Sequence, residues 1–178
     1  MLFRSVRCLN DVPYDVGQDI DLRLVHRAPG PVEADLSEGD GDGDDFEGAP
    51  LGEILIPRVG LSAVVLHGSD AQTLRRGPGH LEHTALPGQP GNVAIAGHRD
   101  SFFRPIRNVR AGDDIFLTTS TQRYHYRVSW VEVVSATNVS VLASTEDATL
   151  TLITCFPFTL IGAAPDRFVV RATAVESP

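Results

Sequence analysis

Short hydrophobic runs separated by turn-forming residues cover the chain from Leu51 onward. Strand-like runs include residues 54–56, 63–66, 92–96, 115–118, 124–134, 149–154 and 168–175. Ser69 and Asp70 can cap a short helix that ends at Gly77. Because the sequence shows no alternation of strands with helices, the pattern predicts a mainly all-β domain, an antiparallel or mixed β-barrel of eight strands with one or two short helices.

Alternation within the predicted strands assigns their side chains to two faces. In the run 149–155, Leu150 and Leu152 share one face, and Thr151, Ile153 and Cys155 share the other. If the leucines fill the core, Cys155 points to the outside of the barrel.

The last predicted strand behaves in the same way, with small and apolar residues on one face and Arg167, Val169 and Arg171 on the other. Arg167 is therefore also expected on the outer face, although alternation does not establish that it lies beside Cys155. In the run 124–134 one face is predicted to hold Tyr124, Tyr126, Val128, Trp130 and Val134.

The composition of the 178 residues, 42% of them hydrophobic, suits one globular domain. The formal charge of −8 lies entirely in residues 1–50, which hold twelve acidic residues against four arginines. We therefore predict an acidic, disordered leader over residues 1–50 and a folded domain over residues 51–178. A neutral domain behind an acidic leader excludes nucleic acid as an expected partner, because phosphate binding needs a clustered cationic surface.

The sequence contains no apolar run near the roughly 20 residues that span a bilayer, and no apolar stretch follows the basic residues near Met1. As written, the chain is expected to carry neither a membrane span nor an export signal. Asp40, Asp42 and Asp44 imitate the opening of a calcium loop. The sixth position of that loop would be Asp45 instead of Gly and the twelfth Leu51 instead of Glu, so a solvated acidic linker is favoured.

The two cysteines, Cys8 and Cys155, are too far apart in sequence to form a small-domain disulfide framework. A bridge between them is the less favoured reading, because Cys8 lies in the predicted leader. The pattern leaves two roles open for Cys155: an inert core residue, or a nucleophile whose thiolate a neighbouring His or Arg favours. His98 is a candidate neighbour, since it follows Gly97 where a predicted strand ends.

A metal site is a further alternative, built on His80 and His83 with the acidic leader. These histidines are three residues apart, but no helix is predicted around them and no carboxylate has matching spacing, so the indication is weak.

Two segments carry a resemblance to a known family. Ala-Ile-Ala-Gly-His-Arg-Asp-Ser-Phe-Phe (94–103) and Thr-Leu-Thr-Leu-Ile-Thr-Cys (149–155), with Arg167 twelve residues after the cysteine, resemble sortases, the cysteine transpeptidases of bacterial cell surfaces. The likeness extends from about Gly52 to Ala172. Further stretches are most like class D sortases: residues 77–80, 84–88, 156–158 and 161–168.

The resemblance implies an eight-stranded sortase β-barrel in which Cys155 is the nucleophile and His98 the acid/base. Arg167 would stabilise the oxyanion or position the substrate, and Thr154 would help to form the site. Neither a metal nor an organic cofactor is implied. The implied partners are a protein bearing an LPxTG-like sorting signal and an amine acceptor, which is an amino group of the cell wall or of a protein.

The resemblance also implies an extracytoplasmic location at the cell surface, although family members usually carry an N-terminal membrane span or signal that is not evident in this sequence. The acidic leader has no counterpart in the family pattern. A catalytically idle barrel that binds peptides or serves as a scaffold remains the alternative. Arg171, on the same face as Arg167, is expected to be a bland residue of a solvent-facing strand.

Overall fold

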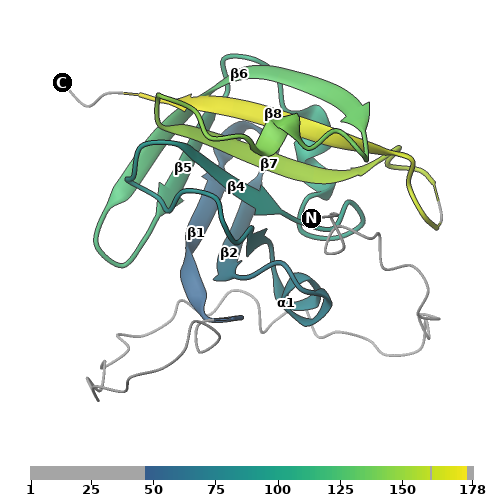
Figure 1. The fold of residues 1–178 in the computed structure, drawn as a ribbon, viewed down its shortest axis with the longest axis horizontal. Helices are drawn as coiled ribbons and strands as arrows, with labels where there is room; N and C mark the ends of the chain where they lie inside the picture. The colour runs from purple at the N-terminus through teal and green to yellow at the C-terminus, as the bar shows by residue number, and fades with distance from the viewer. Residues whose placement is uncertain (1–46, 161, 176–178) are drawn as a thin grey trace.

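The computed structural model describes residues 47–160 and 162–175, so most of the predicted leader lies outside the described residues. Eight strands form a closed barrel (Figure 1). The strands are β1 (Pro50–Ile56), β2 (Leu61–His67), β3 (Gly79–His80), β4 (Asn92–Ala96), β5 (Asp114–Thr118), β6 (Arg123–Ser135), β7 (Thr149–Phe156) and β8 (Asp166–Ala174). Helical structure is confined to α1 (Ala71–Arg76) and the 3-10 turns η2 (Pro57–Val59), η3 (Arg104–Asn108) and η4 (Ser140–Leu142) in the described residues.

The strands follow one another around the barrel in the order β1-β2-β3-β4-β7-β8-β6-β5. β2 pairs with β3 and β4 with β7 in parallel, and the remaining neighbours are antiparallel. The prediction of a mainly β, mixed barrel is therefore confirmed. The strand-like runs named from the sequence did not include β3, because two residues are too few to show a period.

The interior of the barrel is packed with aliphatic side chains from most of the strands. Leu150 and Leu152 of β7 are fully buried there, as alternation predicts, together with Val170 and Ala172 of β8. The segment that follows β4 closes this core with three further residues: Phe103, Ile106 and Val109. The connection between β4 and β5 is consequently part of the barrel core and not a free loop.

The prediction for β6 is wrong at Trp130 and at Val134. Pairing with β8 shifts register between Val128 and Trp130, and Val131 takes the place against the core. Such a bulge adds one residue to a strand and reverses the faces beyond it. The ring of Trp130 instead lies 5.5 Å from the guanidinium carbon of Arg171.

A second, smaller hydrophobic cluster lies outside the barrel against β4. Ala94 and Ala96 face it and contact Leu74 of α1 and Leu81. α1 begins and ends where the sequence predicts: the Asp70 carboxylate accepts from the backbone N–H of residue 72 at 2.6 Å and of residue 73 at 3.2 Å, and Gly77 ends the helix. The outer face of β4 is thus covered, and side chains on it are shielded from water.

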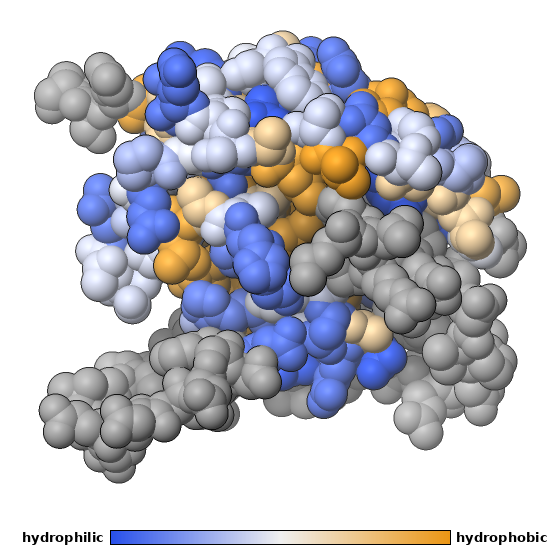
Figure 2. Space-filling view, viewed as in Figure 1, coloured by the Kyte–Doolittle hydropathy of each residue, from blue (hydrophilic) through white to orange (hydrophobic). Residues whose placement is uncertain are grey.

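On the face shown in Figure 2, hydrophobic residues reach the surface in separate patches among hydrophilic ones. Across residues 47–160 and 162–175, no helix has the length and apolar character that crossing a membrane requires.

Candidate active site

The ends of β4 and β7 bring His98 and Cys155 together. These strands are parallel, with Ala96 opposite Ile153, and their arrowheads point to the same side of the barrel in Figure 1. Two hydrogen bonds continue the pairing beyond the strand: Gly97 N–H donates to the Ile153 carbonyl at 3.1 Å, and the Thr154 hydroxyl donates to the Gly97 carbonyl at 2.6 Å. The next residues along the two chains are His98 and Cys155.

The spacing of neighbouring strands is about 4.8 Å, so this register places His98 and Cys155 side by side. Both belong to the outward-facing set: His98 continues the alternation of Ala94 and Ala96, and Cys155 that of Ile153. Thr154 supports this arrangement through its buried hydroxyl, which joins the two strand ends.

Arg167 lies on the other side of Cys155. β7 and β8 are antiparallel, and Cys155 is directly opposite Arg167 in their register. Residues opposite each other in such a pair have Cα atoms about 4.5–5.5 Å apart and present their side chains to the same face. Three adjacent strand ends, of β4, β7 and β8, thus carry the histidine, the cysteine and the arginine in a row.

Cys155 faces outward as predicted but is almost covered, with 7% of its surface exposed. It is the only cysteine among the described residues, and its sulfur is in a disulfide. The only other cysteine of the chain, Cys8, lies outside the described residues. Because only a thiolate attacks a carbonyl, chemistry at Cys155 requires its reduced form.

His98, which the β4–β7 register places next to this cysteine, is half-buried. Burial lowers the pKa of the imidazole from its usual value, and the nearby charge of Arg75 lowers it further, while the Asp100 carboxylate opposes the shift. A lowered pKa keeps the ring neutral at pH 7, in the form that can accept a proton from a thiol or an amine.

Arg167 is also half-buried. Its Nη1 donates to the carbonyl of Ala164 at 3.1 Å and to that of Asp166 at 2.9 Å, which holds the guanidinium next to the β7–β8 connection. Burial lowers its pKa, with a further contribution from the charge of Arg99. Arginine nevertheless stays charged under all working conditions, because its ordinary pKa is far above neutrality.

Arg171 differs from the bland surface residue expected from the sequence. It is half-buried, donates to the Val141 carbonyl at 2.6 Å and to the Thr149 hydroxyl at 3.4 Å, and places its guanidinium near Trp130. Its Nε is buried without a hydrogen-bond partner in the described part of the chain. Arg171 therefore anchors the β6–β7 connection, and a substitution there would disturb that connection.

The histidines of the alternative metal site have other contacts. His80 Nε2 lies 2.9 Å from the Ala85 carbonyl and 3.1 Å from the Thr84 hydroxyl, while His83 is exposed in a left-handed turn with φ of 66°. Within the described ranges, no three His, Cys, Asp or Glu residues group as a metal site would require. The acidic leader in that hypothesis lies mainly outside the described residues.

Sequence reasoning assigned no role to Arg99, the residue after His98. It is 3% exposed and donates to backbone carbonyls of the β7–β8 connection. In the sequence, Arg99 stands out only as a charged residue soon after a hydrophobic strand. The acceptors of Arg99 are distant main-chain carbonyls, which no pattern of side chains can indicate.

Comparison with known proteins supports the same architecture. A sortase-domain family model matches residues 54–175. The chain is 30% identical to Sortase D of Bacillus subtilis (strain 168) over 129 residues, which is 72% of this chain and 65% of the relative. It is 37% identical to Sortase A of Listeria monocytogenes serovar 1/2a over 111 residues, 60% of this chain and 50% of the relative.

Among solved structures, a Clostridium perfringens Sortase D5 transpeptidase aligns with a TM-score of 0.67 and 32% identity, covering 73% of this chain and 81% of that one. Sortase A of Listeria monocytogenes aligns with a TM-score of 0.66 and 32% identity, covering 72% and 88%. The chain spans between half and two thirds of the length of the two curated relatives. The expected likeness to class D is confirmed, and the chain belongs to the sortase family.

Proposed function

We propose that this protein is a cysteine transpeptidase that cleaves an LPxTG-like sorting signal between Thr and the following Gly or Ala and transfers the Thr acyl group to an amine. The observation that carries the proposal is the placement of Cys155 at a strand end with Arg167 directly opposite and His98 at the neighbouring strand end. A thiol between an imidazole and a guanidinium is the arrangement that cysteine acyl transfer needs.

The reaction begins with reduced Cys155. Its proton passes to the neutral imidazole of His98, and the thiolate attacks the Thr carbonyl carbon to form a C–S bond. The tetrahedral oxyanion collapses, the C–N bond breaks, and His98 gives its proton to the leaving amine. A thioester between the Thr carbonyl and the Cys155 sulfur remains.

The second half reverses these roles with a different amine. His98 removes a proton from the incoming amine, whose nitrogen attacks the thioester carbonyl. The new C–N bond forms as the C–S bond breaks, and the thiolate is released. Water can replace the amine slowly, which gives hydrolysis as a side reaction.

Arg167 supplies positive charge where negative charge develops. A guanidinium fixed by two carbonyls of its own loop loses little freedom when it meets the oxyanion or the substrate carbonyl, and such preorganisation is what makes a donor effective. Thr154 acts indirectly in this scheme, through its hydrogen bond to Gly97.

The proposed partners are a protein that carries the sorting signal and an amino group of the cell wall or of another protein. These partners place the reaction outside the cytoplasm at the cell surface. The scheme assigns no step to a metal or an organic cofactor.

The test uses the full chain with a reductant, because the Cys155 sulfur is in a disulfide. A library of LPxTG-type peptides is incubated with and without glycine-based or diamine acceptors, and the products are identified by mass. We expect a ligated peptide only when both substrate and acceptor are present, and no product with Cys155→Ala. Peptide binding by the wild type without any product would instead support the idle-barrel alternative.

A further inference from the structure

Arg99 joins the two halves of the proposed site. It directly follows His98, and its guanidinium donates to three carbonyls of the chain that leaves Cys155: Nη1 to Pro157 at 3.1 Å, and Nη2 to Leu160 and to Gly162, the latter at 3.0 Å. Pro157 is only two residues after the cysteine. Arg99 thus links the β4 side of the site to the β7–β8 connection through one rigid, planar group.

Because Arg99 is buried, its guanidinium depends on these hydrogen bonds. Only 3% of the Arg99 surface is exposed, and a buried guanidinium is costly unless its N–H groups are bonded. Asp100 accepts from Nε at 3.2 Å, but the Asp100 side chain is itself 58% exposed. The carbonyls of the connection therefore accept most of the hydrogen bonds of this buried guanidinium.

Among the described residues of the β7–β8 connection, contacts with the rest of the barrel other than those of Arg99 are few. Phe158 packs on Phe168 with ring centroids 5.2 Å apart, but Thr159 and Leu160 beyond it are exposed. Near its far end, Ala136 N–H donates to the Pro165 carbonyl at 3.0 Å. Without Arg99, the described stretch between the aromatic contact and Pro165 would therefore be held mainly by local bonds, such as that of Arg167 to the Ala164 carbonyl. A chain with so few buried contacts opens easily.

Electrostatics point the same way. The charge of Arg99 contributes to the lowered pKa of Arg167, so the positive field of Arg99 reaches that guanidinium. Three of the hydrogen bonds of Arg99 go to neutral carbonyls, so most of its positive charge is not cancelled by a buried carboxylate. A thiolate or an oxyanion at Cys155 would be favoured by this field.

We propose that Arg99 is a positioning residue: it holds the β7–β8 connection at the spacing at which His98, Cys155 and Arg167 act on one peptide bond. The proposal rests on the proposed function of the site. It adds that the turnover of the bound peptide, more than its binding, depends on this clamp, because small displacements of reacting groups cost rate steeply.

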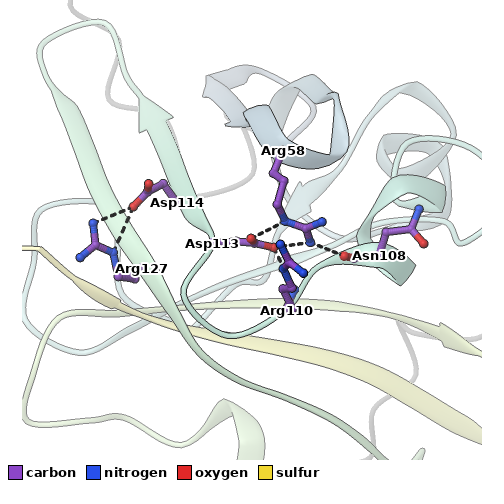
Figure 3. A network of polar contacts seen from close by, with 6 residues as sticks. All are labelled: Arg58, Asn108, Arg110, Asp113, Asp114 and Arg127. Carbon is purple, nitrogen blue, oxygen red and sulfur yellow. Dashed lines mark hydrogen bonds and ion pairs between the residues drawn. The ribbon is translucent and has the colours of Figure 1, made fainter.

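Arg58 provides a matched control, because it lies in η2 and holds the other end of the β4–β5 connection. Its guanidinium donates to the Asp113 carboxylate, with Nη2 to Oδ2 at 2.6 Å, and to the Asn108 carbonyl, as Figure 3 shows. Like Arg99, it ties the β4–β5 connection to the barrel, but it contacts none of the three proposed catalytic residues. Arg58→Gln and Arg99→Gln therefore each remove an arginine that ties one end of this connection to the barrel.

The experiment measures kcat and KM on the wild type's preferred LPxTG-type peptide, in reductant, for the full chain and for Arg99→Gln, Arg99→Lys and Arg58→Gln, each well below its Tm. Arg99→Gln is expected to lower kcat roughly 10²-fold with little change in KM. Arg99→Lys keeps the charge but cannot reach three carbonyls at once, so a smaller loss is expected. Arg58→Gln should lower Tm and leave kcat unchanged.

A second readout does not depend on turnover. Chymotrypsin cuts after Phe and Leu, so cleavage after Phe158 and Leu160, followed by peptide mass, reports how firmly the connection is held. Arg99→Gln is expected to speed these cuts severalfold and Arg58→Gln to leave them unchanged.

Unchanged kcat in Arg99→Gln, or equal losses of kcat in Arg99→Gln and Arg58→Gln, would overturn the positioning role. If the wild type turned over no peptide, the proposed function would fail, and the chymotrypsin cuts would then decide separately whether Arg99 is the clamp. Cleavage as slow in Arg99→Gln as in the wild type would show that it is not.

Discussion

The connection between β4 and β5 is fixed at both ends by an arginine, and the two anchors differ in charge balance. At its start, Arg99 donates mainly to backbone carbonyls. At its end, Arg58 donates to the carboxylate of Asp113, which is 5% exposed. An arginine paired with a carboxylate is neutralised, whereas one paired with carbonyls keeps its positive field. The end of the connection that retains this charge directly follows His98, at the side of the barrel where Cys155 lies.

This contrast separates chemistry from stability. The positive charges around Cys155 favour a negative charge at its sulfur or on a bound oxyanion. The contacts of Asp113 hold the end of the β4–β5 connection, which contributes Ile106 and Val109 to the core, against the barrel. Substitutions at the first end should change rates, and substitutions at the second should change melting.

The largest effect after loss of the nucleophile is expected at His98. His98→Ala removes the group that moves protons in both half-reactions, so turnover should fall by roughly 10²–10⁴-fold. The wild-type rate should follow a bell-shaped pH profile, since a Cys–His pair titrates as a coupled system. Peptide-cleavage rates across pH 5–10 check both points. If His98→Ala kept the wild-type pH profile, the acid/base role would belong to another histidine, and His80 would be the first to test.

A smaller loss is expected at Arg167. Removing one preorganised donor to an oxyanion typically costs about 2.7–4 kcal/mol of barrier, so Arg167→Ala should lower kcat accordingly. Arg167→Lys should be only partly tolerated, because lysine lacks the planar fork. Steady-state kinetics provide the measurement.

Arg127→Ala is the matched control for Arg167, since Arg127 is 56% exposed and pairs with Asp114 on the barrel surface (Figure 3). An exposed pair of this kind contributes little. Arg171→Ala is a poorer control than the sequence indicates, because Arg171 holds the Val141 carbonyl. Equal rates for Arg167→Ala and Arg127→Ala would mean that Arg167 has no part in the chemistry.

At the other end, Asp113→Asn should lower the Tm by several degrees without changing kcat, because it weakens the contact with Arg58. Thermal melts followed by circular dichroism, alongside kinetics at 25 °C, test the separation. A drop in kcat while the protein remains folded would break the division between the two ends.

The smallest effect concerns acid stability. The hydrogen bond from Arg58 holds the pKa of Asp113 below its usual value, with further contributions from the Arg110 backbone and from both arginine charges. The stabilisation is therefore present above the unfolded-state pKa of about 4 and is lost as pH falls through the lowered pKa. Asp113→Asn should flatten this part of the stability curve. Urea melts between pH 2 and pH 6 would detect it, and identical curves for both proteins would contradict it.

Much of the fold follows from alternation in the sequence. Leu150 and Leu152 point inward and Cys155 outward because a strand alternates, and the Asp70 cap and Gly77 bound α1 because their chemistry is local. Trp130 was placed on the wrong face, since a bulge depends on pairing with a distant strand.

The site was predictable only in part. Alternation placed Cys155 and Arg167 on one face, but their direct opposition depends on the register between β7 and β8, which no local pattern fixes. Arg99 was missed for a similar reason: its partners are carbonyls some 60 residues away in sequence, and any residue could supply them. The chemical roles of His98, Cys155 and Arg167 remain predictions.

The most direct test of these roles is the mass of the enzyme during turnover. Reduced full-length protein is mixed with an LPxTG-type peptide without an amine, quenched in acid, and digested for peptide mapping. We predict an added acyl mass on Cys155 that hydroxylamine removes and that an amine acceptor converts to ligated product. Peptide cleavage without any acyl group on Cys155, or an acyl group on another residue, would contradict it.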